Sequence, residues 1–477
     1  MKQASETRLA HAAPASPRLT AVPAGAPPRG PLPRGPRQPR FVQSLRYALW
    51  PYASIDNSFR RYGDCYTVRP LGGPPMVIFT DPEAIKQIFT GDGAELRAGE
   101  ANGSILGPII GWHSILLLDG ERHHRERRLM APPLHGERMH VYGRLMREIA
   151  DRAIDAWPIG RPFPIHHEMQ AITLDVILRA VFGVHEGTRF AHIREGIVRF
   201  LAQADGPSAA FLAIRAFQVE LGGLSPWGRF VRNRETIRTE LLAEIARRRR
   251  EGTEGRTDIL SMLVEARDDQ GEPMTDPELI DEMFTLLMAG HETTATSLAW
   301  AFHHLLERPD VLEKLRAELA RVVGEGPVEP QHISQLEYLD AVIKESQRLC
   351  PVATNVIRRL TRPMRIAGHD LPAGITVSAC IYSTHHHPDL WPDPERFDPE
   401  RFIGARPAPH TFFPFGGGIR RCIGAAFATY EMKIVLAQVL ARTRLRIAAG
   451  YRMRPVLRTI TVAPSAGMPV VLDSRRP

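Results

Sequence analysis

Hydrophobic and polar positions along the chain predict an early hairpin that is followed mainly by helices. Residues 65–69 and 76–79 are rich in β-branched and aromatic side chains and flank a Gly-Gly-Pro-Pro turn, which predicts two paired strands. Asp81, followed by proline, predicts the start of a short helix that ends near Thr90. The pattern between about 137 and 250 is mostly helical.

The longest predicted helix covers about residues 276–307. Thr275 and Glu278 have capping-box spacing, and an Arg-Pro pair follows the far end. At 1.5 Å per residue, roughly 32 residues would span about 48 Å, the width of a domain. Gly290 lies midway, within Ala-Gly-His-Glu-Thr-Thr at residues 289–294. Because glycine inside a helix costs about 1 kcal/mol relative to alanine, its position suggests a functional site or a close packing contact.

Other local signals predict three further features. Ser334, with Glu337 at capping-box spacing, predicts a helix that ends near residue 349. The Gly-rich stretch 101–118 contains too many interruptions for one long element. Residues 460–471 have the pattern of a hairpin with Ser-Ala-Gly-Met at its tip.

Composition is that of an ordinary globular protein, since 43% of the 477 residues are hydrophobic and 24% are charged. Most of the net charge of +8 lies in residues 1–40, which hold six arginines and one lysine against one glutamate. The remainder therefore lacks the basic footprint of a nucleic-acid-binding protein. The same residues contain nine prolines and no apolar core. This predicts a disordered leader, not a signal peptide, before a single domain at 41–477.

Cysteine usage and hydropathy bear on the compartment. The longest uncharged run, 101–118, is broken by glycines and a proline, so no transmembrane anchor is predicted. The four cysteines lie far apart and form no Cys-x-x-Cys pair, which argues against a disulfide framework or a zinc ribbon. We therefore expect a cytoplasmic protein.

One cysteine carries the main chemical signal. Cys422 lies in Phe-Gly-Gly-Gly-Ile-Arg-Arg-Cys-Ile-Gly, residues 415–424, at the start of a helix predicted for 423–442. Free backbone N–H groups in a first helical turn, with Arg420 and Arg421 beside them, would favour thiolate over thiol. Such a thiolate can be a nucleophile, a zinc ligand or an axial ligand of haem iron. A buried structural cysteine is the remaining alternative.

This segment resembles the cysteine loop of the cytochrome P-450 family of haem-thiolate monooxygenases, whose five fixed positions are filled here by Phe415, Gly418, Arg420, Cys422 and Gly424. The motif at 289–294 resembles the family's acid–alcohol motif at every position. The Glu-x-x-Arg at 345–348 and Pro-Glu-Arg-Phe, present at 394–397 and at 399–402, resemble two more. From about residue 41 onward, the order of motifs is similar to that of soluble bacterial members.

The resemblance implies a mainly α fold with a small β-rich side (α+β), in which haem b lies between the long helix and the cysteine-loop helix. Cys422 would be the proximal iron ligand, whose electron donation favours O–O cleavage. Phe415 would shield the sulfur and Gly418 would allow a tight turn. The helix at 119–129, by pattern alone a solvated basic helix, would help to bind the haem propionates. The implied propionate ligands are His123, Arg127, Arg358 and Arg420.

On the other face of the haem, the resemblance implies that Gly290 and Thr293 flank dioxygen and that Glu292 with Thr293 delivers protons. From the residues alone, packing at Gly290 and back-bonding of Thr293 to a carbonyl one turn earlier remain alternatives. A zinc-protease motif is excluded because HExxH would require histidine at the position of Ala295. The implied apolar pocket comprises Phe284, Leu287, Met288, Ala289, Val352, Val356 and Met468. For Phe284, Leu287, Met288 and Val352, core packing is the alternative. The family's substrate-entry lid would lie at about 200–227.

A buried ionic network is implied beneath the haem loop. It would join Glu345 and Arg348 to the arginine of one Pro-Glu-Arg-Phe copy. We expect Arg401 rather than Arg396, because in similar sequences the second copy leads into the segment before the cysteine loop. Without the resemblance, Glu and Arg three residues apart would be a surface pair worth a few tenths of a kcal/mol.

The implied activity inserts one oxygen atom from dioxygen into a hydrophobic small molecule such as a fatty acid or a terpenoid. Because the chain has no flavin or iron–sulfur segment, electrons would come from a ferredoxin or flavodoxin with its NAD(P)H reductase. A basic face made of Arg122, Arg125, Arg128 and Arg421 would dock that acidic donor, and the protein would be a monomer. Three alternatives remain: a peroxygenase that uses hydrogen peroxide, a non-catalytic haem-binding sensor and a cysteine hydrolase.

Overall fold

The structure is a computed structural model that describes residues 32–91, 93, 95–136, 138–183, 194–200, 203 and 225–476. Most of the predicted lid at about 200–227 and most of the predicted leader lie outside these residues. Helices dominate, as the fold prediction required. The α-helices are α1 (Arg40–Leu49), α2 (Pro51–Tyr62), α3 (Pro82–Thr90), α4 (Ala98–Ile110), α5 (Gly120–Met130), α6 (Arg138–Ala156), α7 (Ile165–Phe182), α10 (Pro226–Glu251), α11 (Ile259–Glu265), α12 (Asp276–Glu307), α13 (Pro309–Val322), α14 (Glu337–Leu349), α15 (Ile381–His385) and α16 (Ala425–Arg442).

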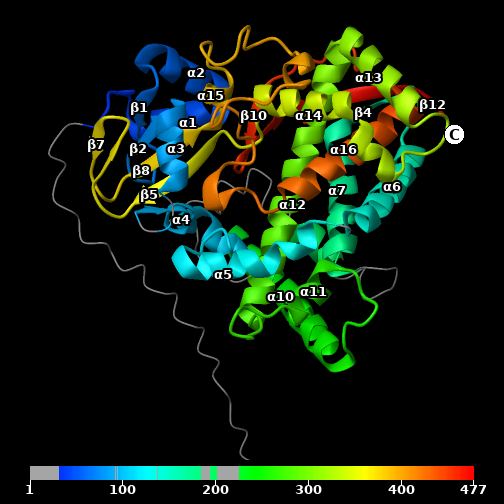
Figure 1. The fold of residues 1–477 in the computed structure, drawn as a ribbon, viewed down its shortest axis with the longest axis horizontal. Coiled ribbons are helices and arrows are strands. Elements are labelled where there is room, and N and C mark those ends of the chain that lie inside the picture. Colours follow the sequence, from blue (N-terminus) through cyan, green and yellow to red (C-terminus); the bar gives the residue numbers. More distant parts are fainter. Residues whose placement is uncertain are drawn as a thin grey trace, which may run out of the picture.

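The strands form small sheets at two ends of the molecule, because β1, β2, β5 and β8 lie at the left of Figure 1 and β4 and β12 lie at its right. The largest sheet has five strands in the order β1-β2-β8-β5-β3, with β2 and β8 parallel and the other pairs antiparallel. The strands are β1 (Cys65–Val68), β2 (Met76–Phe79), β3 (Leu96–Arg97), β4 (Pro162–Pro164), β5 (Asn355–Leu360), β6 (Met364–Ile366), β7 (His369–Leu371), β8 (Thr376–Cys380), β9 (Thr443–Ile447), β10 (Pro455–Arg458), β11 (Thr461–Pro464) and β12 (Pro469–Arg475).

Helix α12 runs through the middle of the molecule and packs on α7, α14 and α16 (Figure 1). Its capping box is present as predicted, because Thr275 Oγ1 accepts from Glu278 N and Glu278 Oε2 accepts from Thr275 N. Trp300 and Phe302 in its second half are fully buried. The helix is therefore buried along most of its length, and any accessible position at its centre is unusual.

The N-terminal boundary differs from the prediction. Thr67 N donates to Arg34 O (3.2 Å) and Thr67 Oγ1 to Pro33 O (2.7 Å). The chain thus joins the edge of β1 ahead of the boundary expected at residue 41. Because β1 is an edge strand, the outer side of Thr67 is free to donate to this segment. The segment is rich in proline, which lacks an N–H, and takes part through its carbonyl groups.

No single element spans stretch 101–118, as predicted, because α4 ends at Ile110 and turns follow. Three other local predictions are wrong in detail. Ser334 lies in a 3₁₀ turn and donates to Gln331 O, and α14 starts at Glu337 without a side-chain cap. Helix α16 begins at Ala425, not at residue 423. Strands β11 and β12 pair with different partners, β10 and β4/β9, instead of with each other.

Candidate active site

The cysteine loop turns tightly against α3. Gly416 and Gly418 have positive φ values of 67° and 64°, which glycine adopts without strain. A Cβ on Gly418 would also collide with the carbonyl of Phe89, so this position requires glycine for two reasons. Cys422 N donates to Phe415 O (2.9 Å), which closes the loop just before α16. The loop thus fixes the position of one thiol by backbone geometry.

The surroundings of that thiol act on its pKa in opposite directions. The Cys422 side chain is exposed, yet the protein packed around the sulfur raises its pKa by desolvation, whereas a hydrogen bond from the backbone of Gly424 and the nearby charges of Arg127 and Arg421 act to lower it. The hydrogen bond and the two arginines are the part of this environment that favours thiolate. Arg420, expected to act on the sulfur, instead donates to Asp119 Oδ1 (2.5 Å).

Basic residues from three segments converge near this loop. The pKa of His123 is lowered to about 3, first by burial and then by the charges of Arg420, Arg127, His124 and Arg358. His123 is 2% exposed, and its Nδ1 has no hydrogen-bond partner within the described part of the chain. All four predicted propionate ligands thus lie in one electropositive region, which is the environment that buried carboxylates require.

The centre of α12 is accessible where its neighbours are buried. Ala289 is exposed and Thr293 is partly exposed, whereas Leu286 and Leu287 are buried. Thr293 Oγ1 donates to Ala289 O (2.6 Å), so its hydroxyl adopts the back-bonded alternative. Gly290 packs closely on α7, because a Cβ there would lie 2.6 Å from Ile177 Cδ1.

The carboxylate of Glu292 is held by α7 and α12. Its Oε2 accepts from Gln170 Nε2 (2.6 Å), and its Oε1 accepts from Thr296 Oγ1 (3.2 Å). His166 Nε2 lies 3.1 Å from Thr296 Oγ1 and 3.6 Å from Glu292 Oε1. No sequence pattern pointed to these partners, since Gln170 and His166 are more than a hundred residues away along the chain.

A cavity of about 460 Å³ adjoins this part of α12. Met288, Ala289, Glu292 and Thr293 line it, and all of these were predicted at the site. The apolar lining residues that sequence reasoning missed include Leu106, Ile109, Ile110, Leu116 and Leu174. Their local patterns, a glycine-interrupted stretch and an ordinary helix, resemble those of core residues.

Five predicted pocket residues do not line this cavity. Phe284 and Leu287 are 1% exposed and Met468 is 0% exposed, so all three are core residues. Phe284 packs on Phe200 and lies under Arg234, both from other helical segments. Val352 bonds through its carbonyl to Val462 N (2.9 Å), and Val356 packs near the cysteine loop. Helical periodicity alone could not show which face of α12 meets the cavity.

The Glu345–Arg348 pair is fully buried. Arg348 Nε and Nη2 donate to the two oxygens of Glu345 at 2.7 and 2.8 Å, and both side chains are 0% exposed. Arg401 Nε lies 3.4 Å from Glu345 Oε1, whereas Arg396 contributes its carbonyl to Arg348 Nη2 (3.2 Å). The structure therefore places the second Pro-Glu-Arg-Phe arginine, rather than the first, in the network.

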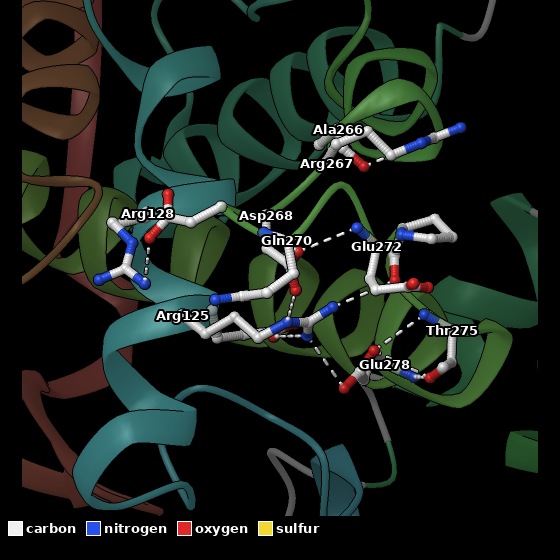
Figure 2. A network of polar contacts seen from close by, with 12 residues as sticks. Arg125, Arg128, Ala266, Arg267, Asp268, Gln270, Glu272, Thr275 and Glu278 are labelled. Atoms are coloured by element: carbon white, nitrogen blue, oxygen red, sulfur yellow. Dashed lines mark hydrogen bonds and ion pairs between the residues drawn. The ribbon is translucent and has the colours of Figure 1, made fainter.

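Two members of the predicted basic face are already paired. Arg125 Nε donates to Asp268 Oδ2 (2.6 Å) and its Nη1 contacts Glu278 Oε1 (3.3 Å), as Figure 2 shows. Arg128 Nη2 lies 3.0 Å from Asp269 Oδ2. These arginines connect α5 to the segment before α12, Arg125 through partly buried contacts and Arg128 through an exposed ion pair. Arg122 and Arg421 remain exposed.

The site has the groups that haem requires. An accessible thiol follows the glycine loop, basic side chains gather nearby around an unsatisfied His123 Nδ1, and small residues open the middle of α12. Cys422 would ligate the iron, and His123, Arg127, Arg358 and Arg420 would meet the propionates. In the described residues, no three His, Cys, Asp or Glu side chains cluster as a separate metal site.

Fold and site together define a haem-thiolate enzyme with the cytochrome P450 fold. The sequence profile described as Cytochrome P450 matches residues 33–469. The chain belongs to this family and is a cytochrome P450 monooxygenase whose cofactor is haem b.

Curated relatives support the same assignment. A protein named putative cytochrome P450 135B1, from Mycobacterium tuberculosis, is 39% identical over 447 residues, which cover 93% of this chain and 92% of the relative. Putative cytochrome P450 138 of the same species is 36% identical over 461 residues, covering 96% and 99%.

Solved structures share the fold. Retinoic acid bound cyanobacterial CYP120A1 has a TM-score of 0.80 and 25% identity, covering 93% of this chain and 99% of that one. The haem domain of cytochrome P450DA has a TM-score of 0.82 at 22% identity, covering 94% and 98%. Within the described residues, no helix has the length and hydropathy needed to cross a bilayer.

Proposed function

We propose that the enzyme inserts one atom of dioxygen into a hydrophobic small molecule of the fatty-acid or terpenoid type. The observation that carries this proposal is the acid–alcohol pair, Glu292 and Thr293, at the wall of a cavity with a largely apolar lining. An apolar cavity with a few polar groups is typical of a site for a small hydrophobic ligand. Retinoic acid, named with the cyanobacterial relative, is itself a terpenoid.

Haem, when bound, supplies a redox-active iron whose thiolate ligand favours cleavage of the O–O bond. Thr293 and Glu292 would move protons towards that bond. Neighbouring side chains on a helix diverge by about 100°, so a water molecule in the cavity would connect the carboxyl of Glu292 to the hydroxyl of Thr293. The back-bond to Ala289 orients that hydroxyl while its lone pairs can still accept a proton.

Thr293→Ala tests this role. The variant should keep the carbon monoxide difference band of a thiolate-ligated haem but release much of the electron flow as hydrogen peroxide. Tight coupling of NAD(P)H use to product in the variant would contradict proton delivery by Thr293.

Wild-type turnover with hydrogen peroxide that equals turnover with NAD(P)H and redox proteins would indicate a peroxygenase. A carbon monoxide band without oxygenated product from any fatty acid or terpene would indicate a sensor.

For electron supply we propose a separate acidic ferredoxin or flavodoxin with its NAD(P)H reductase. Arg122 and Arg421 are the exposed members of the basic face that form no ion pair within the described residues, whereas Arg125 is held by Asp268 and Arg128 pairs with Asp269 on the surface. Arg122→Glu should slow reduction by the donor at low salt, and the effect should shrink at high salt. The matched control is Arg232→Glu on α10, which makes the same charge change at another exposed position. Equal rates in both variants would contradict docking at Arg122.

We also propose that the protein works as a monomer in the cytoplasm. All four cysteines are free thiols, which supports a reducing compartment. Size-exclusion chromatography with light scattering would test the oligomeric state.

A further inference from the structure

We propose that Gln170 and His166 on α7 are positioning residues that hold the carboxylate of Glu292 in one orientation for proton transfer. The inference rests on the proposed function, in which Glu292 is the acid of the proton-delivery pair. It adds two side chains from a different helix to that pair. Neither the motif at 289–294 nor any other sequence pattern pointed to them.

The hydrogen bonds around Glu292 run from donors towards its carboxylate. Gln170 Nε2 can only donate, and it lies 2.6 Å from Glu292 Oε2. Thr296 Oγ1 donates its single proton to Glu292 Oε1 (3.2 Å), so its oxygen is left to accept from His166 Nε2 (3.1 Å). Both carboxylate oxygens therefore receive donors, one directly and one through a chain that begins at His166.

His166 is suited to begin such a chain because it stays neutral. Burial lowers its pKa to about 3, with smaller effects from Arg458, His167 and His291. The ring is 0% exposed and sits in the first turn of α7, which fixes its place against α12. A neutral imidazole has one N–H, and with that proton on Nε2 it donates to Thr296. The charge of Glu292 is then set by fixed hydrogen bonds and by its other titratable neighbours.

These neighbours come from every side of the cavity. His167 on α7, His291 on α12 and Arg458 on β10 line it together with Gln170 and Glu292. Because several titratable groups line the cavity, the experiment must follow a signal that comes from the carboxyl of Glu292 itself. Donors to a carboxylate favour its ionised form, so the loss of one donor should raise the pH at which Glu292 ionises.

Packing alone is the rival explanation, because α7 and α12 contact each other along much of their length. The chain offers a matched control for this. Thr173 Oγ1, on the same helix as Gln170, shares its proton between the carbonyl of Met169 (2.9 Å) and the backbone carbonyl of His291 on α12 (3.0 Å), and it does not donate to Glu292. Thr173→Val removes a hydrogen bond between the same two helices and leaves the carboxylate untouched.

The direct test follows the protonated carboxyl of Glu292 by infrared spectroscopy in protein without haem, with the band assigned by its loss in Glu292→Gln. Gln170→Leu should shift the midpoint of this band upward by about one pH unit, because it removes a charge-assisted hydrogen bond. His166→Phe should shift it upward by less, because it only frees Thr296, which still donates to Glu292. Gln170→Asn and His166→Gln, which keep a donor, should shift it less. Thr173→Val should leave it in place.

A second readout uses the haem-loaded enzyme. Gln170→Leu and His166→Phe should keep the carbon monoxide band and raise the hydrogen peroxide released per NAD(P)H several-fold, whereas Thr173→Val should not. Unchanged midpoints in both α7 variants, or equal shifts in Thr173→Val, would overturn the proposal. If the wild type makes no oxygenated product, the proposed function fails, but the infrared titration still decides whether Gln170 and His166 hold Glu292.

Discussion

Individual residues at this site are constrained by burial as much as by chemistry. Glu345 and Arg348 are an example, because their charges are compensated by each other at 0% exposure. Breaking a buried pair by removing one partner costs about 3–5 kcal/mol, since the other charge remains without compensation. The same pair on a surface would be worth a few tenths of a kcal/mol, which is what spacing alone predicted.

Glu345→Ala should therefore lower the free energy of unfolding by about 3–5 kcal/mol and prevent normal haem loading. Urea unfolding and the ratio of haem absorbance to protein would measure the two effects. Glu337→Ala, at an exposed position of the same helix, is the control and should change neither. Normal haem content in Glu345→Ala would show that the network is not needed to form the site.

Gly290→Ala tests a steric constraint. The added methyl would meet Ile177 Cδ1 at 2.6 Å, so we expect a loss of about 1–3 kcal/mol from overpacking. Ile177→Val, which removes that Cδ1 atom, should recover part of the loss in the double variant. Gly326→Ala, where a Cβ would meet nothing within 4 Å, is the control. If the changes in unfolding free energy of the two single variants simply add in the double variant, the contact between these residues is not the cause of the loss.

At the scale of elements, α5 is joined to the start of α12 by a network that crosses a short irregular segment (Figure 2). Arg125 contacts Asp268, Glu126 and Glu278 and donates to Pro273 O (3.1 Å). Helix α5 also carries His123 and Arg127. The network therefore fixes the helix that supplies two of the proposed propionate ligands.

Glu126 should make this connection sensitive to pH. Its pKa is raised to about 7 from an ordinary value of 4.5, first by burial and then by Glu278, while Arg125 and Arg122 oppose the rise. The folded protein thus keeps a proton that the unfolded chain releases above about pH 4.5. The free energy of unfolding is therefore not reduced by Glu126 below about pH 4.5, and it falls as the pH rises towards 7, because the buried carboxyl must then ionise.

Glu126→Gln cannot titrate, so its stability relative to the wild type should increase between pH 5 and pH 8. Urea unfolding at the two pH values would measure the difference. Glu121→Gln, at an exposed position of α5, should track the wild type at both. A constant difference between Glu126→Gln and the wild type would show that Glu126 does not titrate in this range.

At the scale of the whole molecule, segments far apart in the chain create a local excess of positive charge. His123 and Arg127 come from α5, Arg358 from β5 and Arg420 from the cysteine loop. The carboxylates of a bound haem would compensate these charges, so cofactor binding and folding should be linked.

Removal of haem should lower the unfolding temperature, and the drop should be smaller at high salt because ions screen repulsion among the basic residues. Calorimetry or circular dichroism of loaded and haem-free protein at low and high salt would measure both. An equal drop at the two salt concentrations would mean that the iron–sulfur bond and apolar contacts alone account for the linkage.

The sequence by itself determined the elements whose hydrogen bonds close within a few residues. The capping box at Thr275 and Glu278, the hairpin of β1 and β2 and the glycine loop before Cys422 are of this kind. It also determined the family, because four short motifs recur in a fixed order. Such signals are local and depend on residue type and spacing alone.

Only the tertiary structure decided what each side chain meets. It placed Gly290 against Ile177, gave Glu292 its donors from α7 and paired Arg125 with acidic residues. Contacts and desolvation depend on segments that are distant in sequence, and the local pattern of one segment carries no information about the other.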